Sequence, residues 1–208
     1  MAYSVINTEY KRRVEECIKR AVELAIQEKK RVGAFFTEES LRYLVMSELS
    51  SKRHYENDFP TYPSLKSTSR PVLLFEFPYD RWYNVNKRMK NKLKQKSGNA
   101  IYKPDIVCLK LNNKGQITES LYIIELKVKT NKSDIQKCAE YVHPDIGGQS
   151  FHFAICIDFK SANRWKEEPG EPPSNSDLIS HLSTRSKGNI LWVSTDDDFH
   201  VKSQWFLF

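Results

Sequence analysis

Three charged residues near the middle of the chain stand in a pattern that could hydrolyse a phosphodiester bond. Asp105 begins one apolar run, and Glu125 and Lys127 take alternate positions in the next apolar run. Two carboxylates can bind a hard divalent cation such as Mg²⁺ through oxygen ligands. A lysine two residues further on can orient or help deprotonate a water molecule, and can offset charge that develops on a phosphate. The residue types therefore predict a site for metal-dependent phosphodiester chemistry.

The stretches that carry these residues are expected to form a β-hairpin. An apolar run covers 106–111, a turn rich in Asn and Gly follows at 112–115, and a second apolar run covers 121–128. Two apolar runs joined by such a turn are typical of antiparallel strands. The hairpin would hold Asp105 at the beginning of its first strand and Glu125 near the end of its second.

The geometry of a strand would bring the charged residues together. Side chains alternate between the two faces of a strand, so Glu125, Lys127 and Lys129 would share one face. Asp105 can lie across from Glu125 on the neighbouring strand. Charged groups inside an apolar strand are costly to bury without partners, so the pattern favours a functional site.

The rest of the chain predicts the frame around this hairpin. The pattern of apolar residues predicts helices at 8–31, 38–50 and 133–143. Short apolar runs predict further strands at 72–77, 151–157, 190–193 and 205–208. Elements in this order predict a single domain of the α/β class, with a central mixed β-sheet flanked by helices.

A strongly basic segment, about 81–99, is expected as an insertion in this domain. Seven lysine and arginine residues lie between Arg81 and Lys96 with no acidic residue among them, and the net charge of the whole chain is +7. Lysines displace phosphate counterions and aromatic rings such as Trp82 stack on bases, so the segment favours a nucleic acid partner. The expected phosphate contacts are Lys87, Arg88, Lys90, Lys92 and Lys94. A solvated loop without a partner is the alternative.

Composition limits the class of protein. No run of 18 apolar residues is present, which excludes a membrane-spanning helix, and the first residues lack the layout of a signal peptide. The four cysteines lie far apart, so buried free thiols in a cytoplasmic protein are expected. No Gly-rich phosphate loop precedes a helix, and the five histidines have no paired nucleophile. Neither an ATP-driven enzyme nor a hydrolase triad is therefore expected.

The charged residues of the hairpin also resemble a known signature. Pro104-Asp105 and, 20 positions after the aspartate, Glu125-Leu126-Lys127 resemble the PD-(D/E)xK motif of the restriction-endonuclease-like nucleases. The resemblance implies a core of the order αβββαβ that cleaves nucleic acid with Mg²⁺, or with Mn²⁺ in its place. It also implies that Asp105 and Glu125 bind the metal and that Lys127 takes part in catalysis.

The resemblance covers about 37–160 and extends to the second helix. Many members of the superfamily have a glutamate on the helix before the sheet, and Glu48 matches that position. This match implies that Glu48 is a further catalytic residue and metal ligand. Glu48 also stands where the helical pattern expects an apolar side chain. A carboxylate that reaches past the core to water is the alternative for this residue.

The expected helix at 133–143 adds polar groups that could face a phosphate backbone. RecB-like members of the superfamily show Gln-x-x-x-Tyr on this helix, whereas Gln136 and Tyr141 are five positions apart here. The chain departs from that pattern, although Lys137 and Tyr141 share a helical face. These three residues and Lys129 are expected to bind nucleic acid, and a plain surface helix is the alternative.

A second stretch of the chain satisfies the same signature. Pro144-Asp145 precedes Asp158-Phe159-Lys160. Asp145 leads into a Gly-Gly turn rather than a strand, and a Pro-rich segment follows Asp158 closely. The motif on the expected hairpin is therefore preferred.

Together these patterns favour a Mg²⁺-dependent nuclease, either an endonuclease or an exonuclease, that acts on DNA. Its expected setting is restriction, defence or repair, and no membrane partner is expected. A homodimer is compatible with this function, because dimerisation is common where both strands of a duplex are cut. Two alternatives stay open. One is a catalytically silent nucleic-acid-binding or assembly module with the same fold, and the other is a protein-interaction domain whose basic segment binds an acidic partner.

Overall fold

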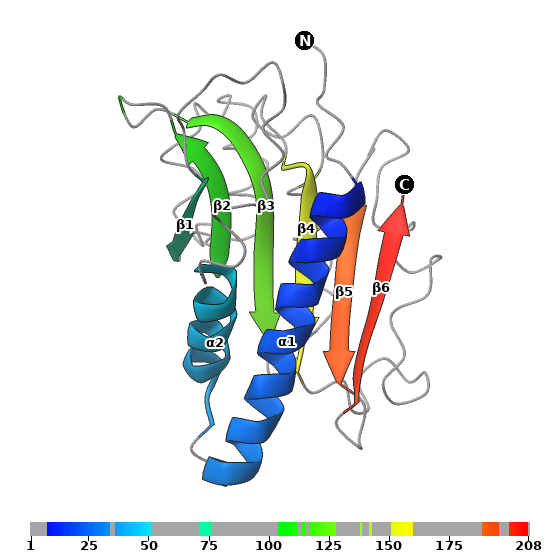
Figure 1. Cartoon of the computed structure of the whole chain (residues 1–208). Coiled ribbons are helices and arrows are strands. Elements are labelled where there is room, and N and C mark those ends of the chain that lie inside the picture. The colour runs from blue at the N-terminus through cyan, green and yellow to red at the C-terminus, as the bar shows by residue number, and fades with distance from the viewer. Residues whose placement is uncertain are drawn as a thin grey trace, which may run out of the picture.

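The computed structural model describes the main helices and strands and short segments beside them. The described residues are 8–33, 36–50, 71–75, 104–111, 114, 117–127, 138, 142, 151–159, 189–195 and 200–207. They form one mixed β-sheet with two helices in front of it (Figure 1). The α/β architecture expected from the sequence is therefore present in the described part of the chain.

Two amphipathic helices, α1 (Thr8–Val32) and α2 (Glu38–Ser50), cover one face of the sheet. Both lie where the apolar spacing predicts them, within one residue at each end. α1 buries apolar side chains that recur every three or four positions, and it ends beside Gly33, whose φ of 60° suits a residue without a Cβ. The Thr37 hydroxyl accepts a hydrogen bond of 3.3 Å from the backbone N–H of Ser40 and caps α2.

In the described part of the chain six strands form the sheet, and their order across the sheet is their order in the chain. The strands are β1 (Pro71–Phe75), β2 (Ile106–Leu111), β3 (Ile117–Lys127), β4 (Phe153–Asp158), β5 (Asn189–Thr195) and β6 (Val201–Leu207). β1, β2 and β3 are antiparallel neighbours, β3, β4 and β5 run parallel, and β6 is antiparallel to β5. The predicted hairpin is confirmed as β2 and β3.

Two strands begin well before the residue at which the apolar pattern predicts their start. β3 begins at Ile117 and β6 begins at Val201, each four residues before the predicted start. Polar residues extend both strands, because Glu119 pairs with β2 and Lys202 pairs with β5. Backbone hydrogen bonds do not require apolar side chains, so hydrophobicity alone underestimates the length of a strand.

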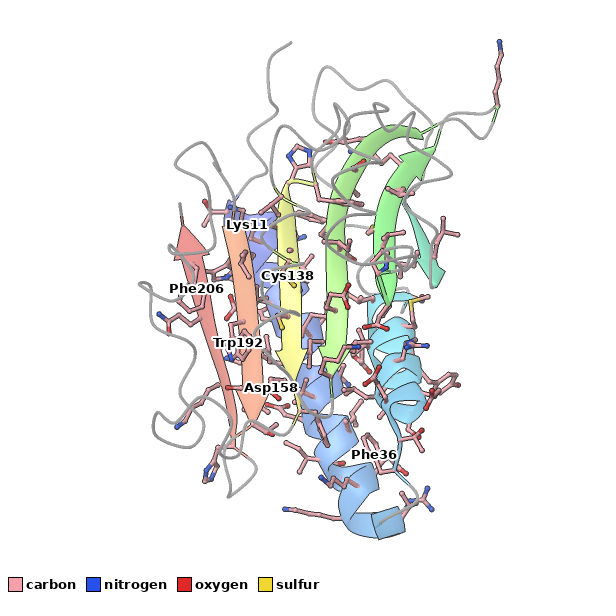
Figure 2. All side chains as sticks on the ribbon, turned by 180° about the vertical axis from the view of Figure 1, so that it is seen from behind. Lys11, Phe36, Cys138, Asp158, Trp192 and Phe206 are labelled. Atoms are coloured by element: carbon pink, nitrogen blue, oxygen red, sulfur yellow. The ribbon has the colours of Figure 1, made fainter. Side chains whose placement is uncertain are left out.

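Apolar side chains are buried on both faces of the sheet. Ile124 and Ile155 belong to the core that α1 and α2 share with the front face. Side chains alternate along each strand, so Cys156 and Trp192 are buried on the opposite face. Figure 2 shows Cys138 and Trp192 on that second face, away from α1. Burial on both faces accounts for the nearly continuous apolar runs of the parallel strands.

Part of the predicted helix at 133–143 falls within the described residues. Cys138 has a helical backbone, and Cys138 and Val142 are both buried. The rest of that helix and the basic segment at 81–99 lie outside the described residues.

All four cysteines are buried and free, as predicted: Cys17, Cys108, Cys138 and Cys156. Burial raises the pKa of the Cys108 thiol to about 12, which keeps it protonated and unreactive. Within the described segments, no helix is both long enough and apolar enough to cross a membrane.

Candidate active site

The register of the β2–β3 hairpin places Asp105 opposite Glu125. Ile106 pairs with Ile124, and one further step along antiparallel strands sets position 105 across from position 125. Asp105 lies in the bend immediately before β2, and Glu125 lies near the end of β3. α2 lies beside this end of the hairpin (Figure 1). The register therefore sets positions 105 and 125 across from each other, as the hairpin predicts.

Asp105 is buried, and both of its carboxylate oxygens have partners from other elements. Its Oδ2 accepts a hydrogen bond of 2.8 Å from the backbone N–H of Leu126 on β3. Its Oδ1 lies 2.8 Å from Nη2 of Arg42 on α2. The residue is only 6% exposed. Asp105 thus joins the first strand of the hairpin to the second strand and to α2.

Lys127 stands between Asp105 and the first turn of α2. Its Nζ lies 3.4 Å from Asp105 Oδ2 and 3.3 Å from Glu38 Oε1. Burial alone would lower the pKa of this ammonium, but the negative charges of Asp105, Glu38 and Glu125 outweigh it, and the net shift is upward from 10.5. Lys127 is therefore a cation at neutral pH.

Glu125 is the most deeply buried carboxylate of the hairpin, at 2% exposure. Ile124 and Leu126, its neighbours in β3, pack into the core beneath the helices, so Glu125 points to the opposite face. A carboxylate in an apolar strand is costly to bury without compensation. The Lys127 ammonium, whose pKa responds to Glu125, supplies part of that compensation.

The charges around the hairpin end do not cancel. The negative groups are the carboxylates of Glu38, Asp105 and Glu125, which all act on the Lys127 ammonium. The positive groups are Lys127 and Arg42, which contacts both Asp105 and Glu38. Among the described residues that contact or act on Lys127 and Asp105, three carboxylates and two cations leave one net negative charge. Such a group attracts a further cation, which a site for a divalent metal requires.

Polar residues end the three parallel strands at one edge of the sheet. Lys127 of β3 is in register with Asp158 of β4, and Asp158 is in register with Ser194 of β5. Residues in register share a face, so these side chains form a row on the face that carries Glu125. Figure 2 shows Asp158 at the edge where β3, β4 and β5 end. Ligands of open α/β sheets bind outside the carboxyl ends of the strands, so the row extends the candidate site.

The sequence pattern does not single out Ser194, and it presents Asp158 only as part of the rival motif. Both residues are buried, at 1% and 2% exposure respectively. The one sequence feature that the two residues share is their position at the end of an apolar run. This feature indicates a common site only when the strand order, with β4 and β5 beside β3, is known. Asp145, the other half of the rival motif, lies outside the described residues.

Backbone and ring contacts fix this edge of the sheet. The Phe159 N–H donates a hydrogen bond of 2.9 Å to the carbonyl of Lys127, and the Thr195 hydroxyl donates to the carbonyl of Phe159. The Phe159 ring stacks on Phe36, just before α2, with 5.1 Å between the ring centroids. The ends of β3, β4 and β5 are thereby tied to one another and to the beginning of α2.

Glu48, predicted as a further metal ligand, pairs with α1 in the structure. Its Oε2 lies 3.4 Å from Nε of Arg20, and its side chain is 16% exposed. Among the described residues, no three His, Cys, Asp or Glu side chains gather as a group that could hold a metal ion. The structure therefore does not assemble Glu48 with Asp105 and Glu125 into one cluster.

All nine of the predicted nucleic acid contacts fall outside the described residues. They are Lys87, Arg88, Lys90, Lys92, Lys94, Lys129, Gln136, Lys137 and Tyr141. Two residues that the sequence pattern did not indicate, Arg42 and Glu38, lie in direct contact with the predicted site. Both belong to the first two turns of α2, and nothing in their local sequence marks them, because their partners are distant in the chain.

The chain matches no family model, no curated protein and no solved structure. Functional inference therefore depends on the residues of the candidate site and on their geometry.

Proposed function

We propose that this protein is a metal-dependent nuclease that hydrolyses phosphodiester bonds, with DNA as the favoured substrate. The observation that carries the proposal is the opposition of Asp105 and Glu125 across the hairpin, with Lys127 two residues beyond Glu125. Two carboxylates and a lysine at one strand end supply oxygen ligands for a cation and a positive charge for a phosphate.

The proposed fold is a restriction-endonuclease-like core. The described elements that support it are α2, the antiparallel strands β1, β2 and β3, and then the parallel strand β4. The helical backbone at Cys138, between β3 and β4, is compatible with a helix at that point in the order. This order agrees with the αβββαβ arrangement that the PD-(D/E)xK resemblance implies.

The donor set fits Mg²⁺ better than a metal that needs a complete protein cage. Mg²⁺ commonly keeps several water molecules and is held by one or two carboxylates together with substrate phosphates. Asp105 and Glu125 would hold the ion, and the net negative charge of the group favours it. When bound, the ion supplies Lewis acidity that activates water and stabilises negative charge on the phosphate.

Lys127 would act as a cation rather than as a base. Its pKa is raised by Asp105, Glu38 and Glu125 despite burial, so its ammonium stays protonated at neutral pH. A protonated lysine can orient the attacking water and neutralise the phosphate as charge develops on it. Deprotonation of the water then falls to another group or to solvent.

A catalytically silent nucleic-acid-binding module is the second candidate. The observation that favours it is the ion pair between Arg42 and Asp105, which occupies a proposed metal ligand. A protein that had lost turnover could keep the fold and neutralise Asp105 in this way. The two candidates differ in cleavage and agree in nucleic acid binding.

The decisive experiment offers the full chain supercoiled plasmid, linear duplex, single-stranded DNA and RNA. Each substrate is incubated with Mg²⁺, with Mn²⁺ and with EDTA. We expect metal-dependent cleavage that is lost in Asp105→Ala and Lys127→Ala proteins and kept in Lys114→Ala, which removes an exposed lysine from the turn between β2 and β3 at the other end of the hairpin. Equal cleavage by the parent and both site variants would contradict the site. Salt-sensitive binding without cleavage of any substrate would favour the silent module.

A further inference from the structure

The two carboxylate oxygens of Asp105 have different kinds of partner, one from the backbone of β3 and one from the Arg42 side chain. Asp105 Oδ2 is fixed to β3 by the backbone N–H of Leu126 at 2.8 Å. Asp105 Oδ1 is paired with Arg42 Nη2 at 2.8 Å, and this contact is made by a long side chain from a different element. Oδ1 is therefore the oxygen that can exchange Arg42 for a metal ion.

Glu38 offers the Arg42 guanidinium a second partner. Arg42 Nη2 lies 3.7 Å from Glu38 Oε1, and the two residues are one helical turn apart on α2. Lys127 Nζ lies 3.3 Å from the same oxygen. The Glu38 side chain is 30% exposed, so it can follow a moving cation without disturbing the core. Arg42 and Lys127 are thus both shared between Asp105 and Glu38.

We propose that Arg42 is the resident counter-ion of Asp105, and that a divalent cation displaces it toward Glu38. This inference rests on the proposed function, because it assumes that Asp105 is a metal ligand. A buried charge that loses its partner is strongly destabilising, and the Arg42 side chain is only 14% exposed. Glu38 keeps the displaced guanidinium paired, so the exchange exposes no lone charge. Arg42 and Glu38 are positioning residues in this scheme.

The exchange predicts opposite effects of two substitutions on metal affinity. Mn²⁺ is titrated into the full chain without nucleic acid, and binding is followed by electron paramagnetic resonance. We expect Arg42→Gln to bind Mn²⁺ about fivefold tighter, because the competing cation is removed, and Glu38→Gln to bind about threefold weaker. Arg31→Gln, which removes an exposed ion pair with Glu28 on α1, is the control and should match the parent.

A double variant separates exchange from a simple effect of charge. If Glu38 acts by receiving Arg42, the effect of Glu38→Gln shrinks to less than about 1.5-fold in the Arg42→Gln background. If the two charges act independently through space, the effect of Glu38→Gln is the same in both backgrounds. Equal effects in both backgrounds overturn the exchange, as does an Arg42→Gln protein that binds Mn²⁺ no tighter than the parent.

Two further proteins keep the test decisive. Circular dichroism checks that each variant is folded, and Arg42→Lys, which keeps the charge on a smaller head group, replaces Arg42→Gln if that protein fails to fold. The Mn²⁺ affinity of Arg42→Lys should exceed that of the parent by a smaller factor, and equal affinity overturns the proposal.

Asp105→Asn distinguishes failure of the exchange from failure of the proposed metal site. If neither it nor the parent binds Mn²⁺ at millimolar concentration, the proposed metal site fails as well. If the parent binds, Asp105→Asn does not, and Arg42→Gln matches the parent, only the exchange fails.

Discussion

The carboxylate of Asp105 accepts a hydrogen bond of 2.8 Å from the backbone N–H of Leu126, 21 positions later in the chain. This bond crosses the hairpin at the point where β2 begins and β3 ends. It fixes Asp105 relative to the residues on either side of Leu126, which are Glu125 and Lys127. The same contact therefore orients the three charged residues and stabilises the fold, so changes at this site affect both.

Removal of the Asp105 carboxylate should destabilise the protein as well as inactivate it. Asp105→Ala leaves the Leu126 N–H, Arg42 and Lys127 without this acceptor, and we expect a loss of about 3 kcal/mol in the free energy of unfolding. Asp105→Asn keeps one oxygen acceptor and should lose about half as much. Urea denaturation measures both losses. Equal stability of the alanine variant and the parent would contradict the contacts described for Asp105.

Replacement of Lys127 should lower the cleavage rate without changing its pH dependence near neutrality. We expect Lys127→Met to cut at least about 100-fold more slowly than the parent, because the charge that faces the phosphate is lost. The pKa of Lys127 is raised above 10.5, so its charge stabilises the fold below that pH, and this stabilisation is lost as the pH rises through the folded pKa. Rate profiles from about pH 6 to about pH 9 should therefore show no titration of this residue.

A control for that experiment is Lys114→Met, at an exposed position in the turn between β2 and β3. It removes the same charge and adds the same side chain, at the end of the hairpin opposite to Asp105 and Lys127. A parental cleavage rate in this variant, beside a slow Lys127→Met protein, assigns the effect to the site. A titration step near neutral pH that disappears in Lys127→Met would instead show that Lys127 acts as a base.

Glu119, at the opposite end of β3, should stabilise the fold at neutral pH and lose this effect in acid. Glu119 lies 2.9 Å from His152 Nε2 and 2.7 Å from Lys110 Nζ. Its hydrogen bond with His152 lowers the pKa of the carboxyl to about 2, against an opposing effect of burial and with help from Lys110. A lowered pKa means stability that is present above pH 4.5 and is lost as the pH falls toward about 2.

We therefore expect Glu119→Gln to unfold more easily by about 2 kcal/mol at pH 7, and by clearly less at about pH 3. Urea denaturation at the two pH values measures this difference. Cleavage by the folded variant should match that of the parent, because Glu119 stands apart from the edge where β3 ends. A penalty that does not depend on pH would contradict the assignment to the carboxylate charge.

The contact between α1 and β6 should stabilise the fold without affecting the site. Glu15 of α1 accepts hydrogen bonds from the Ser203 hydroxyl at 2.6 Å and from Trp205 Nε1 at 2.7 Å. Glu15→Ala leaves both half-buried donors without this acceptor, and we expect a loss of about 1–2 kcal/mol. Thermal unfolding measures the loss, and tryptophan fluorescence reports any release of β6. A cleavage rate below that of the parent under folded conditions would argue against a purely structural role.

Much of the local structure follows from the spacing of residues. The helical periods of α1 and α2 predict their bounds within one residue, and the Thr37 hydroxyl, one residue before α2, caps that helix. The turn between two apolar runs predicts the hairpin, and the register of that hairpin sets Asp105 across from Glu125. These features depend on residues that are near one another in the chain, so periodicity and turn chemistry are sufficient to predict them.

Other features of the site depend on strand order and on how helices dock. Asp158 and Ser194 join the site because β4 and β5 lie parallel beside β3, and no local pattern specifies that order. Arg42 meets Asp105 across 63 positions of the chain. Glu48, on the same helix, pairs instead with Arg20 of α1. The period of a helix predicts which polar residues share a face. How the helix packs against the other elements decides which of them contact a partner.

The sequence by itself determined the opposition of Asp105 and Glu125 and the position of Lys127, because alternation along a strand and the turn of a hairpin are local properties. Only the tertiary structure decided what surrounds them. It set Arg42 and Glu38 against the hairpin and aligned Asp158 with Lys127. Contacts between elements arise from burial of apolar faces shared by distant segments, and a spacing rule within one segment contains no information about them.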